Sequence, residues 1–163
     1  MSDASADLVR LMNASLVIVT AAADDERVGC LVGFHSQCSI EPTRYALWVS
    51  RANHTFRVAA RATHLAVHLL GTGARELADL FGGTTGDSVD KFAGLEWSPG
   101  PGGAPLLAAC PNRMVVRRVA AFDDGGDHVC LVGEPMLAEV GDPGLTPMRL
   151  VDVDGIEPGH RAR

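Results

Sequence analysis

The sequence predicts a mainly β fold, a closed or half-open barrel of antiparallel strands with helices inserted between them. Apolar, β-branched segments of strand length recur along the chain and are separated by turn residues. The helical segments do not alternate regularly with the strands, which argues against a doubly wound parallel sheet. We expect one domain, residues 1–163, with the barrel core at about 14–140 and an irregular tail rich in Pro, Gly and Asp at 141–163.

The first part of the chain is predicted to form a short amphipathic helix and then three strands. Leu8, Leu11 and Met12 recur at helical spacing within Ala6–Asn13. The next segment is apolar and β-branched, and the charged run 24–27 turns the chain back on itself. The three strands are expected at Ser15–Ala23, Val28–Phe34 and Arg44–Ser50.

The second part is predicted to add two helices and four strands. Asn53 is a good N-cap for a helix at Asn53–Ala62, because its side chain can accept a backbone N–H. A second helix is expected at Ala74–Phe81. The acidic, glycine-rich segment 123–127 predicts a tight hairpin turn between the last two strands. The four strands are expected at His64–Leu70, Pro105–Ala109, Asn112–Phe122 and His128–Glu139.

Composition and charge exclude several classes of function. Apolar residues make up 47% of the chain, which predicts a packed core. The net charge is −6 and no basic cluster is present, so nucleic acid is not an expected partner. The apolar runs are too short to span a bilayer, and the N-terminus lacks the pattern of a signal peptide. We therefore expect a cytoplasmic protein with no membrane partner.

The four cysteines are expected to be free thiols. None belongs to a C-x-x-C pair, so no metal site is expected. Cys30 and Cys130 lie in apolar strand patterns and are predicted to be core residues. Cys38 lies in a polar segment, where it is either an ordinary free thiol or one that faces a ligand.

A polar segment directly follows the second predicted strand. A plain hairpin would carry Asn-Gly or Asp-Gly at this place, and this chain instead has five polar or small residues in succession. Backbone N–H groups and short side chains in such a loop suit a flat polar ligand. The candidate ligand-binding residues are Gly33, His35, Ser36, Gln37, Cys38 and Ser39.

A second candidate site lies at the start of the Asn53–Ala62 helix. Asn53 and Thr55 can serve as a helix cap alone. They can also belong to an anion site, because the free N–H groups and the dipole of a helix N-terminus favour negative charge. Arg51 would add a fixed positive charge and a fork of donors. These are the groups that a phosphate monoester requires.

Taken in order, these segments resemble the flavin reductase-like proteins, which bind FMN in a split β-barrel. The resemblance rests on Gly29 with the small polar segment and Glu41-Pro42, on Arg51 to Thr55, and on four later motifs. Together the segments run from about Leu16 to Glu139, nearly the whole chain. The later motifs are Leu77 to Gly82, Asp90 to Phe92, Gly103 to Leu107 and Gly126 to His128.

The resemblance implies an NAD(P)H:FMN reductase, a flavin-dependent oxidoreductase that transfers hydride from NADH or NADPH to bound FMN or FAD. It implies that Arg51, Asn53 and Thr55 bind the FMN phosphate, that the polar segment faces the isoalloxazine ring, and that His128 contacts the nicotinamide. Similar proteins are homodimers with the flavin near the subunit seam, and their reduced flavin can serve a partner monooxygenase. No side chain is expected to be required as an acid, base or nucleophile.

Other functions stay open at this point. Many similar proteins have Thr-Ala where this chain has Leu31-Val32, which leaves open a deazaflavin-dependent or substrate-specific split-barrel oxidoreductase. A flavin-binding module without turnover and a purely structural dimer are further alternatives.

Overall fold

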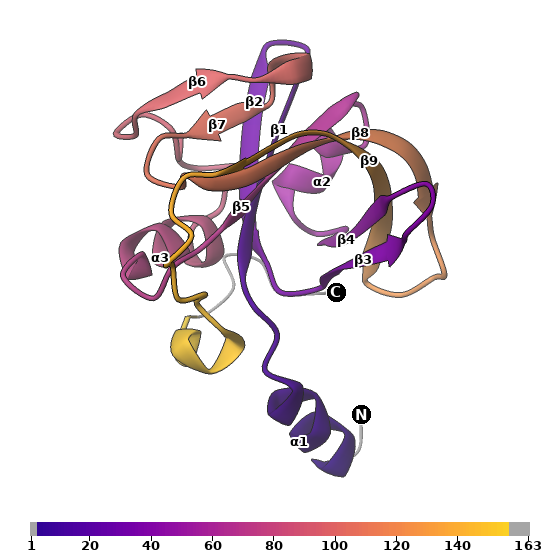
Figure 1. The fold of residues 1–163 in the computed structure, drawn as a ribbon, viewed down its shortest axis with the longest axis vertical. Helices are drawn as coiled ribbons and strands as arrows, with labels where there is room; N and C mark the ends of the chain where they lie inside the picture. Colours follow the sequence, from indigo (N-terminus) through magenta and orange to yellow (C-terminus); the bar gives the residue numbers. More distant parts are fainter. Residues whose placement is uncertain (1–2, 157–163) are drawn as a thin grey trace.

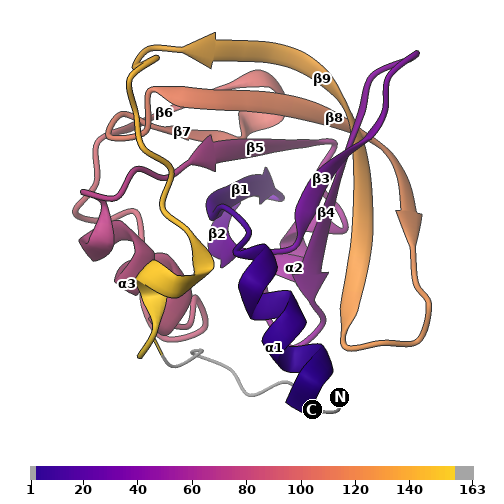
Figure 2. The ribbon, with the colours of Figure 1, turned by 60° about the horizontal axis from the view of Figure 1, so that its bottom comes forward.

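A seven-stranded antiparallel sheet curls into a half-open barrel in the computed structural model, which describes residues 3–156 (Figures 1 and 2). The elements are α1 (Asp3–Met12), β1 (Val17–Ala23), β2 (Glu26–Val32), β3 (His35–Ser39), β4 (Arg44–Ser50), α2 (His54–Ala59), β5 (His64–Leu69), α3 (Arg75–Gly83), β6 (Trp97–Pro99), η1 (Pro101–Gly103), β7 (Pro105–Leu107), β8 (Asn112–Phe122), β9 (His128–Val140) and η2 (Leu150–Val153). The strand order is β2-β1-β5-β8-β9-β4-β3, and β6 pairs with β7 in a second small sheet. The predicted mainly β, antiparallel fold is confirmed.

Most predicted elements lie close to their expected positions. Strands β4 and β8 have the predicted bounds. Asn53 caps α2 as predicted, with its Oδ1 accepting the backbone N–H of Thr55 at 3.0 Å. Helix α2 ends at Ala59 instead of Ala62, because the chain must turn there to enter β5.

The polar segment 35–39 is a strand, so the prediction of a loop is wrong. β3 pairs with β4 through Ser36↔Ala46 and Gln37↔Tyr45. It is an edge strand with mostly exposed side chains, and it therefore lacks the apolar alternation that marks a half-buried strand. Strand β6 was also not predicted, since three residues that include a proline carry no strand pattern.

The long β8–β9 hairpin curls over the core. Its register shifts between Val115 and Val116 and again between Arg118 and Ala120. Bulges of this kind bend a strand and increase its twist. Gly133 of β9 permits close packing at the bend, because a Cβ there would lie 2.4 Å from Cγ2 of Val116. The bent hairpin carries β9 across to pair with β4.

Three apolar clusters fill the described part of the molecule, and the smallest consists of Ala66, Ala104, Leu106 and Val115. The largest one lies inside the barrel, between the sheet and α2, and includes Cys30. The second packs α3 and the 3₁₀ helix η2 around Phe81 and Phe92. The four cysteines are free, and Cys30 and Cys130 are buried as predicted, whereas Cys38 is exposed.

The two ends of the described chain meet beside the barrel. Where the sequence predicts an irregular tail, residues 141–156 contain neither an α-helix nor a strand, and 157–163 lie outside the described residues. This segment nevertheless forms bridges at Ser15↔Arg149 and Gly71↔Pro147 before it ends in η2. Helix α1 extends away from the barrel (Figure 1). Among residues 3–156, no helix has the length and apolar character needed to cross a membrane.

His68 links the main sheet to the small one. It is fully buried on β5, where its Nδ1 donates to the carbonyl oxygen of Ile18 in β1 at 3.1 Å. Its Nε2 accepts the backbone N–H of Leu107 in β7 at 3.1 Å. These two bonds require the neutral imidazole, and burial lowers the pKa of His68 from 6.5 to about 4.

We expect acid to destabilise the fold through His68. Because the folded-state pKa is lowered, the unfolded chain takes up the proton first as the pH falls from 6.5 to about 4. The contribution of neutral His68 to the free energy of unfolding is fully present above pH 6.5. It is lost as the pH falls to about 4, to a total of roughly 3 kcal/mol. His68→Gln cannot gain the proton, so urea unfolding at pH 7 to 4 should show a shallower loss of stability than in the wild type. Identical slopes would contradict this role.

Candidate functional site

Two cavities lie beside the start of α2. The first, which we call the Phe34 cavity, has a volume of about 460 Å³. Its walls are mainly apolar with a few polar groups, which is typical of a small-molecule site. The lining residues are Leu16, Leu31, Gly33, Phe34, Ser50, Asn53, Phe81, Gly82, Thr84, His128, Leu150, Val153, Asp154, Gly155 and Ile156.

Distant parts of the chain bring polar groups to the Phe34 cavity. Strands β4 and β9 pair at Ser50↔His128, so the end of β4 lies beside the start of β9. Asn53 comes three residues after Ser50 in the chain. The ring of Phe34 meets the His128 ring edge-on, with the ring centroids 5.1 Å apart. The Nδ1 of His128 lies 2.7 Å from the carboxylate of Asp127, and this hydrogen bond lowers the pKa of Asp127. The imidazole is therefore held in place at the cavity wall.

The C-terminal segment 150–156 forms one wall of the Phe34 cavity. It is fixed by contacts with residues near the N-terminus. The N–H of Leu150 donates to the carbonyl of Ala14 at 3.0 Å, and the N–H of Val151 donates to Oδ1 of Asn13 at 3.2 Å. Arg10 and Asp154, 144 residues apart, form an exposed ion pair at 3.2 Å. Sequence reasoning missed this wall, because no local pattern indicates contacts over such a separation.

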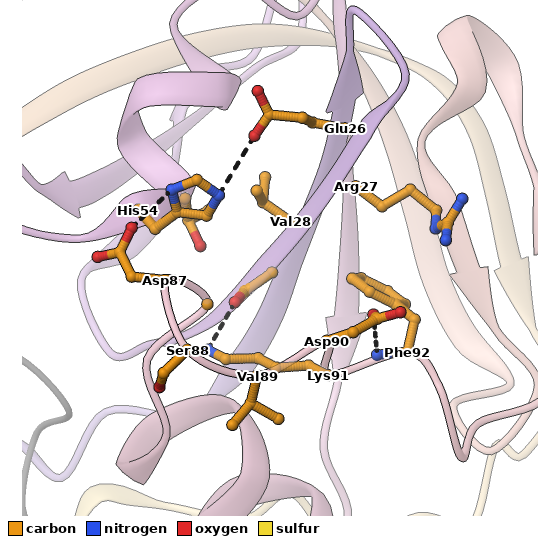
Figure 3. A pocket seen from close by; sticks show the side chains of 13 residues that line it. Glu26, Arg27, Val28, His54, Asp87, Ser88, Val89, Asp90, Lys91 and Phe92 are labelled. Carbon is orange, nitrogen blue, oxygen red and sulfur yellow. Dashed lines mark hydrogen bonds and ion pairs between the residues drawn. The ribbon is translucent and has the colours of Figure 1, made fainter.

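The second cavity, which we call the Lys91 cavity, has a volume of about 340 Å³ and a more polar lining (Figure 3). It lies between β2, the start of α2 and the segment 86–92. Its lining residues are Glu26, Arg27, Val28, Gly29, His54, Thr55, Gly86, Asp87, Ser88, Val89, Asp90, Lys91 and Phe92.

An ionic network forms the rim of the Lys91 cavity. The His54 ring lies between two carboxylates, with Nε2 at 3.4 Å from Glu26 and Nδ1 at 3.1 Å from Asp87 (Figure 3). Arg57 also contacts Asp87, at 2.5 Å, and Arg61 contacts Glu26 at 3.5 Å. Each exposed pair contributes little alone. Together they connect β2, α2 and the segment 86–92.

Lys91, the only lysine in the chain, is 5% exposed in the wall of this cavity. Its Nζ donates to the carbonyl oxygens of Gly29 at 3.0 Å and Phe81 at 3.2 Å. Burial lowers the pKa of Lys91, because removal from water disfavours the charged form. The two hydrogen bonds of the Lys91 ammonium group connect β2 to the end of α3.

The predicted phosphate-binding residues do not converge on one cavity. Asn53 lines the Phe34 cavity, and the buried Thr55 lines the Lys91 cavity. The guanidinium of Arg51 contacts the carboxylate of Asp123 and donates to the carbonyl of Gly126 at 2.7 Å. The hydrogen bond that Arg51 donates to Asp123 is the main cause of the raised pKa of Arg51. Arg51 thus lies against the β8–β9 turn in this structure.

The residues of the predicted ligand loop lie mainly along β3. Gly33 lines the Phe34 cavity, whereas His35 makes hydrogen bonds elsewhere. Its Nδ1 lies 2.6 Å from the hydroxyl of Tyr45, and its Nε2 lies 2.8 Å from the carbonyl of Ser15. The remaining four are on the sheet edge: Ser36, Gln37, Cys38 and Ser39. Their ligand contacts stay predictions.

Comparison with known proteins identifies the family. The flavin reductase-like domain model matches residues 9–155, and the chain therefore belongs to the flavin reductase-like family. One relative is the reductase subunit HsaB of a flavin-dependent monooxygenase from Mycobacterium tuberculosis, 27% identical over 88% of this chain and 76% of the subunit. Another is the FMN reductase (NADH) SmoA of Agrobacterium fabrum, 28% identical over 78% of this chain and 72% of SmoA.

Solved structures share the split-barrel fold. The flavin reductase HpaC, solved with NADP⁺, superposes with a TM-score of 0.79 over 91% of this chain and 92% of its own, at 21% identity. The NADH:FAD oxidoreductase SgcE6 of Streptomyces globisporus C-1027 gives a TM-score of 0.77 over 89% of this chain and 87% of its own, at 23% identity.

Proposed function

We propose that this protein is an NAD(P)H-dependent flavin reductase whose Phe34 cavity holds the flavin ring and the nicotinamide. One observation carries the proposal: Gly33, Asn53 and His128, from three separate segments, line the same apolar cavity. Each was a candidate site residue on sequence grounds alone. The two named relatives, a reductase subunit of a flavin-dependent monooxygenase and an FMN reductase (NADH), support the same activity.

The lining of the Phe34 cavity fits a flat aromatic cofactor with polar edges. Leu16, Leu31 and Phe81 offer apolar surface to a ring, and the hydroxyl of Ser50 and the amide of Asn53 offer hydrogen bonds at its edge. A bound flavin supplies the hydride-accepting chemistry. This chain would orient the flavin and nicotinamide rings, exclude water from between them and hold His128 beside the nicotinamide.

The first test is the visible spectrum of the purified protein with FMN or FAD, followed by oxidation of NADH and NADPH. We expect flavin binding and nicotinamide oxidation that depends on added flavin. Flavin binding without turnover would instead identify a flavin-binding module. Turnover only with a deazaflavin would identify the deazaflavin-dependent alternative, which Leu31 in the cavity wall keeps open.

We further propose that Arg51, Asn53 and Thr55 bind the FMN phosphate, with Arg51 leaving Asp123 when the phosphate is present. A hydrogen bond to a charged group contributes roughly 1.5–3 kcal/mol, so Arg51→Ala should weaken FMN binding on the order of tenfold to a hundredfold. Riboflavin, which lacks the phosphate, should respond far less. Asp123→Asn is the matched control and should not weaken FMN binding. Equal losses of FMN and riboflavin affinity would remove the phosphate assignment.

His128→Ala should raise the KM for the nicotinamide substrate and leave FMN affinity nearly unchanged. The reason is the position of His128 at the cavity wall, fixed between Phe34 and Asp127. His64→Ala, on a histidine outside both cavities, is the control for steady-state kinetics. A change in flavin titrations with unaltered nicotinamide kinetics would show that the role assigned to His128 is wrong.

Exposed aromatic side chains on neighbouring strands, on either side of the buried Cys130, support a homodimer. Trp48, Cys130 and Phe122 are paired neighbours on β4, β9 and β8, and the backbone of Phe34 bonds to that of Trp48. Phe34 and Phe122 are 53% and 63% exposed. Because Phe34 also lines the cavity, a partner subunit seated here would enclose the flavin and cover the sheet edge.

Sedimentation across a concentration series, with and without FMN, should show a dimer whose affinity rises with flavin. Phe122→Glu should shift the equilibrium toward the monomer, whereas Leu11→Glu on the projecting α1 should not. A wild-type monomer that binds flavin tightly would contradict the shared site.

We also propose a partner protein, a monooxygenase that consumes the reduced flavin. The proposed place of action is the cytoplasm, which holds the nicotinamide pool.

A further inference from the structure

Lys91 has no task in the proposed contact between the flavin and nicotinamide rings, although it is the only lysine of the chain and is almost fully buried. We propose that its ammonium charge, held behind a wall of the Phe34 cavity, makes this cavity bind reduced flavin more tightly than oxidised flavin. Lys91 thereby raises the reduction potential of the bound flavin. This inference rests on the proposed function and adds a charge-bearing residue to the same site.

The Lys91 ammonium group lies directly behind one wall of the Phe34 cavity. Its Nζ is 5.6 Å from the centroid of the Phe81 ring, and Phe81 lines that cavity together with Gly82. The hydrogen bonds to the carbonyls of Gly29 and Phe81 hold the ammonium group in this place. A flavin ring packed against Phe81 is therefore separated from the charge by one aromatic ring.

No carboxylate neutralises this charge. In the Lys91 cavity, Glu26 and Asp87 are each in contact with an arginine, and Asp90 accepts the backbone N–H of Phe92 at 3.0 Å. Among residues 3–156, no carboxylate lies within ion-pair distance of Lys91. Because Lys91 is only 5% exposed, water also screens its charge weakly.

Hydride transfer adds negative charge to the flavin ring. A hydride carries two electrons and one proton, so the neutral ring becomes an anion when NADH becomes NAD⁺. A fixed positive charge close to the ring stabilises the anion more than the neutral form. The FMN phosphate has nearly the same charge in both forms, so any attraction between it and Lys91 cancels when the two forms are compared.

The test compares the Kd of oxidised FMN with the Kd of FMN that is reduced by dithionite in the absence of oxygen. We expect the wild type to bind the reduced form on the order of tenfold more tightly. For a two-electron couple, a tenfold ratio corresponds to a potential about 30 mV above that of free FMN. A reductive titration against a reference dye measures this potential independently of turnover.

Three variants of Lys91 separate its charge from its hydrogen bonds. Lys91→Gln keeps N–H donors for the two carbonyls but carries no charge, and Lys91→Met removes both. In each of them the ratio of the two Kd values should fall close to one. Lys91→Arg keeps the positive charge and should retain most of the preference for reduced FMN.

Phe81→Leu is the control for the shape of the cavity wall. It keeps the ammonium group and both backbone carbonyls that bind it. This variant should weaken oxidised and reduced FMN by the same factor, because a lost packing contact acts on both forms alike. A purely structural role of Lys91 would give the same equal loss in Lys91→Gln.

Two results would overturn the role of Lys91. One is equal affinity of the wild type for oxidised and reduced FMN, a measurement that needs no variant. The other is an unchanged ratio in Lys91→Gln. In both cases the flavin reductase function would stand. Failure of the wild type to bind flavin in either form would overturn the proposed function and the role of Lys91 together.

Discussion

The close contact between β2 and α3 is the constraint on which both cavities depend. Strand β2 is at an edge of the main sheet and pairs only with β1 there, so its other side needs support. Gly29 allows the Phe81 ring to approach, since a Cβ at that position would lie 2.7 Å from the ring. Lys91 then bonds to the carbonyls of both residues. Two buried carbonyls would lose their shared donor without this lysine, which is a costly change in a protein interior.

This arrangement divides the space beside β2 into two cavities of unlike chemistry. The Phe34 cavity has aliphatic and aromatic walls and suits stacked rings. The Lys91 cavity carries carboxylates held in a network with His54, Arg57 and Arg61.

Phe34 connects the proposed site to the outer surface of the barrel. Its ring contacts His128 within the cavity and is also half exposed beside Trp48. The segment 150–156 closes the opposite wall through contacts with the chain near Asn13. The segment 150–156 thus closes one side of the Phe34 cavity. The side at Phe34 is open, and there we propose that a second subunit binds.

The sequence by itself determined the mainly β class, most strands, the Asn53 cap of α2 and the buried Cys30, because periodicity and capping are local properties. Its motifs also selected Gly33, Asn53 and His128. Only the tertiary structure decided that these three share a cavity, that Arg51 lies against Asp123 and that residues 35–39 form an edge strand. It alone revealed the role of Lys91 and the wall at 150–156. These features depend on contacts between distant segments, and an exposed edge strand or a buried lysine leaves no periodic pattern in the chain.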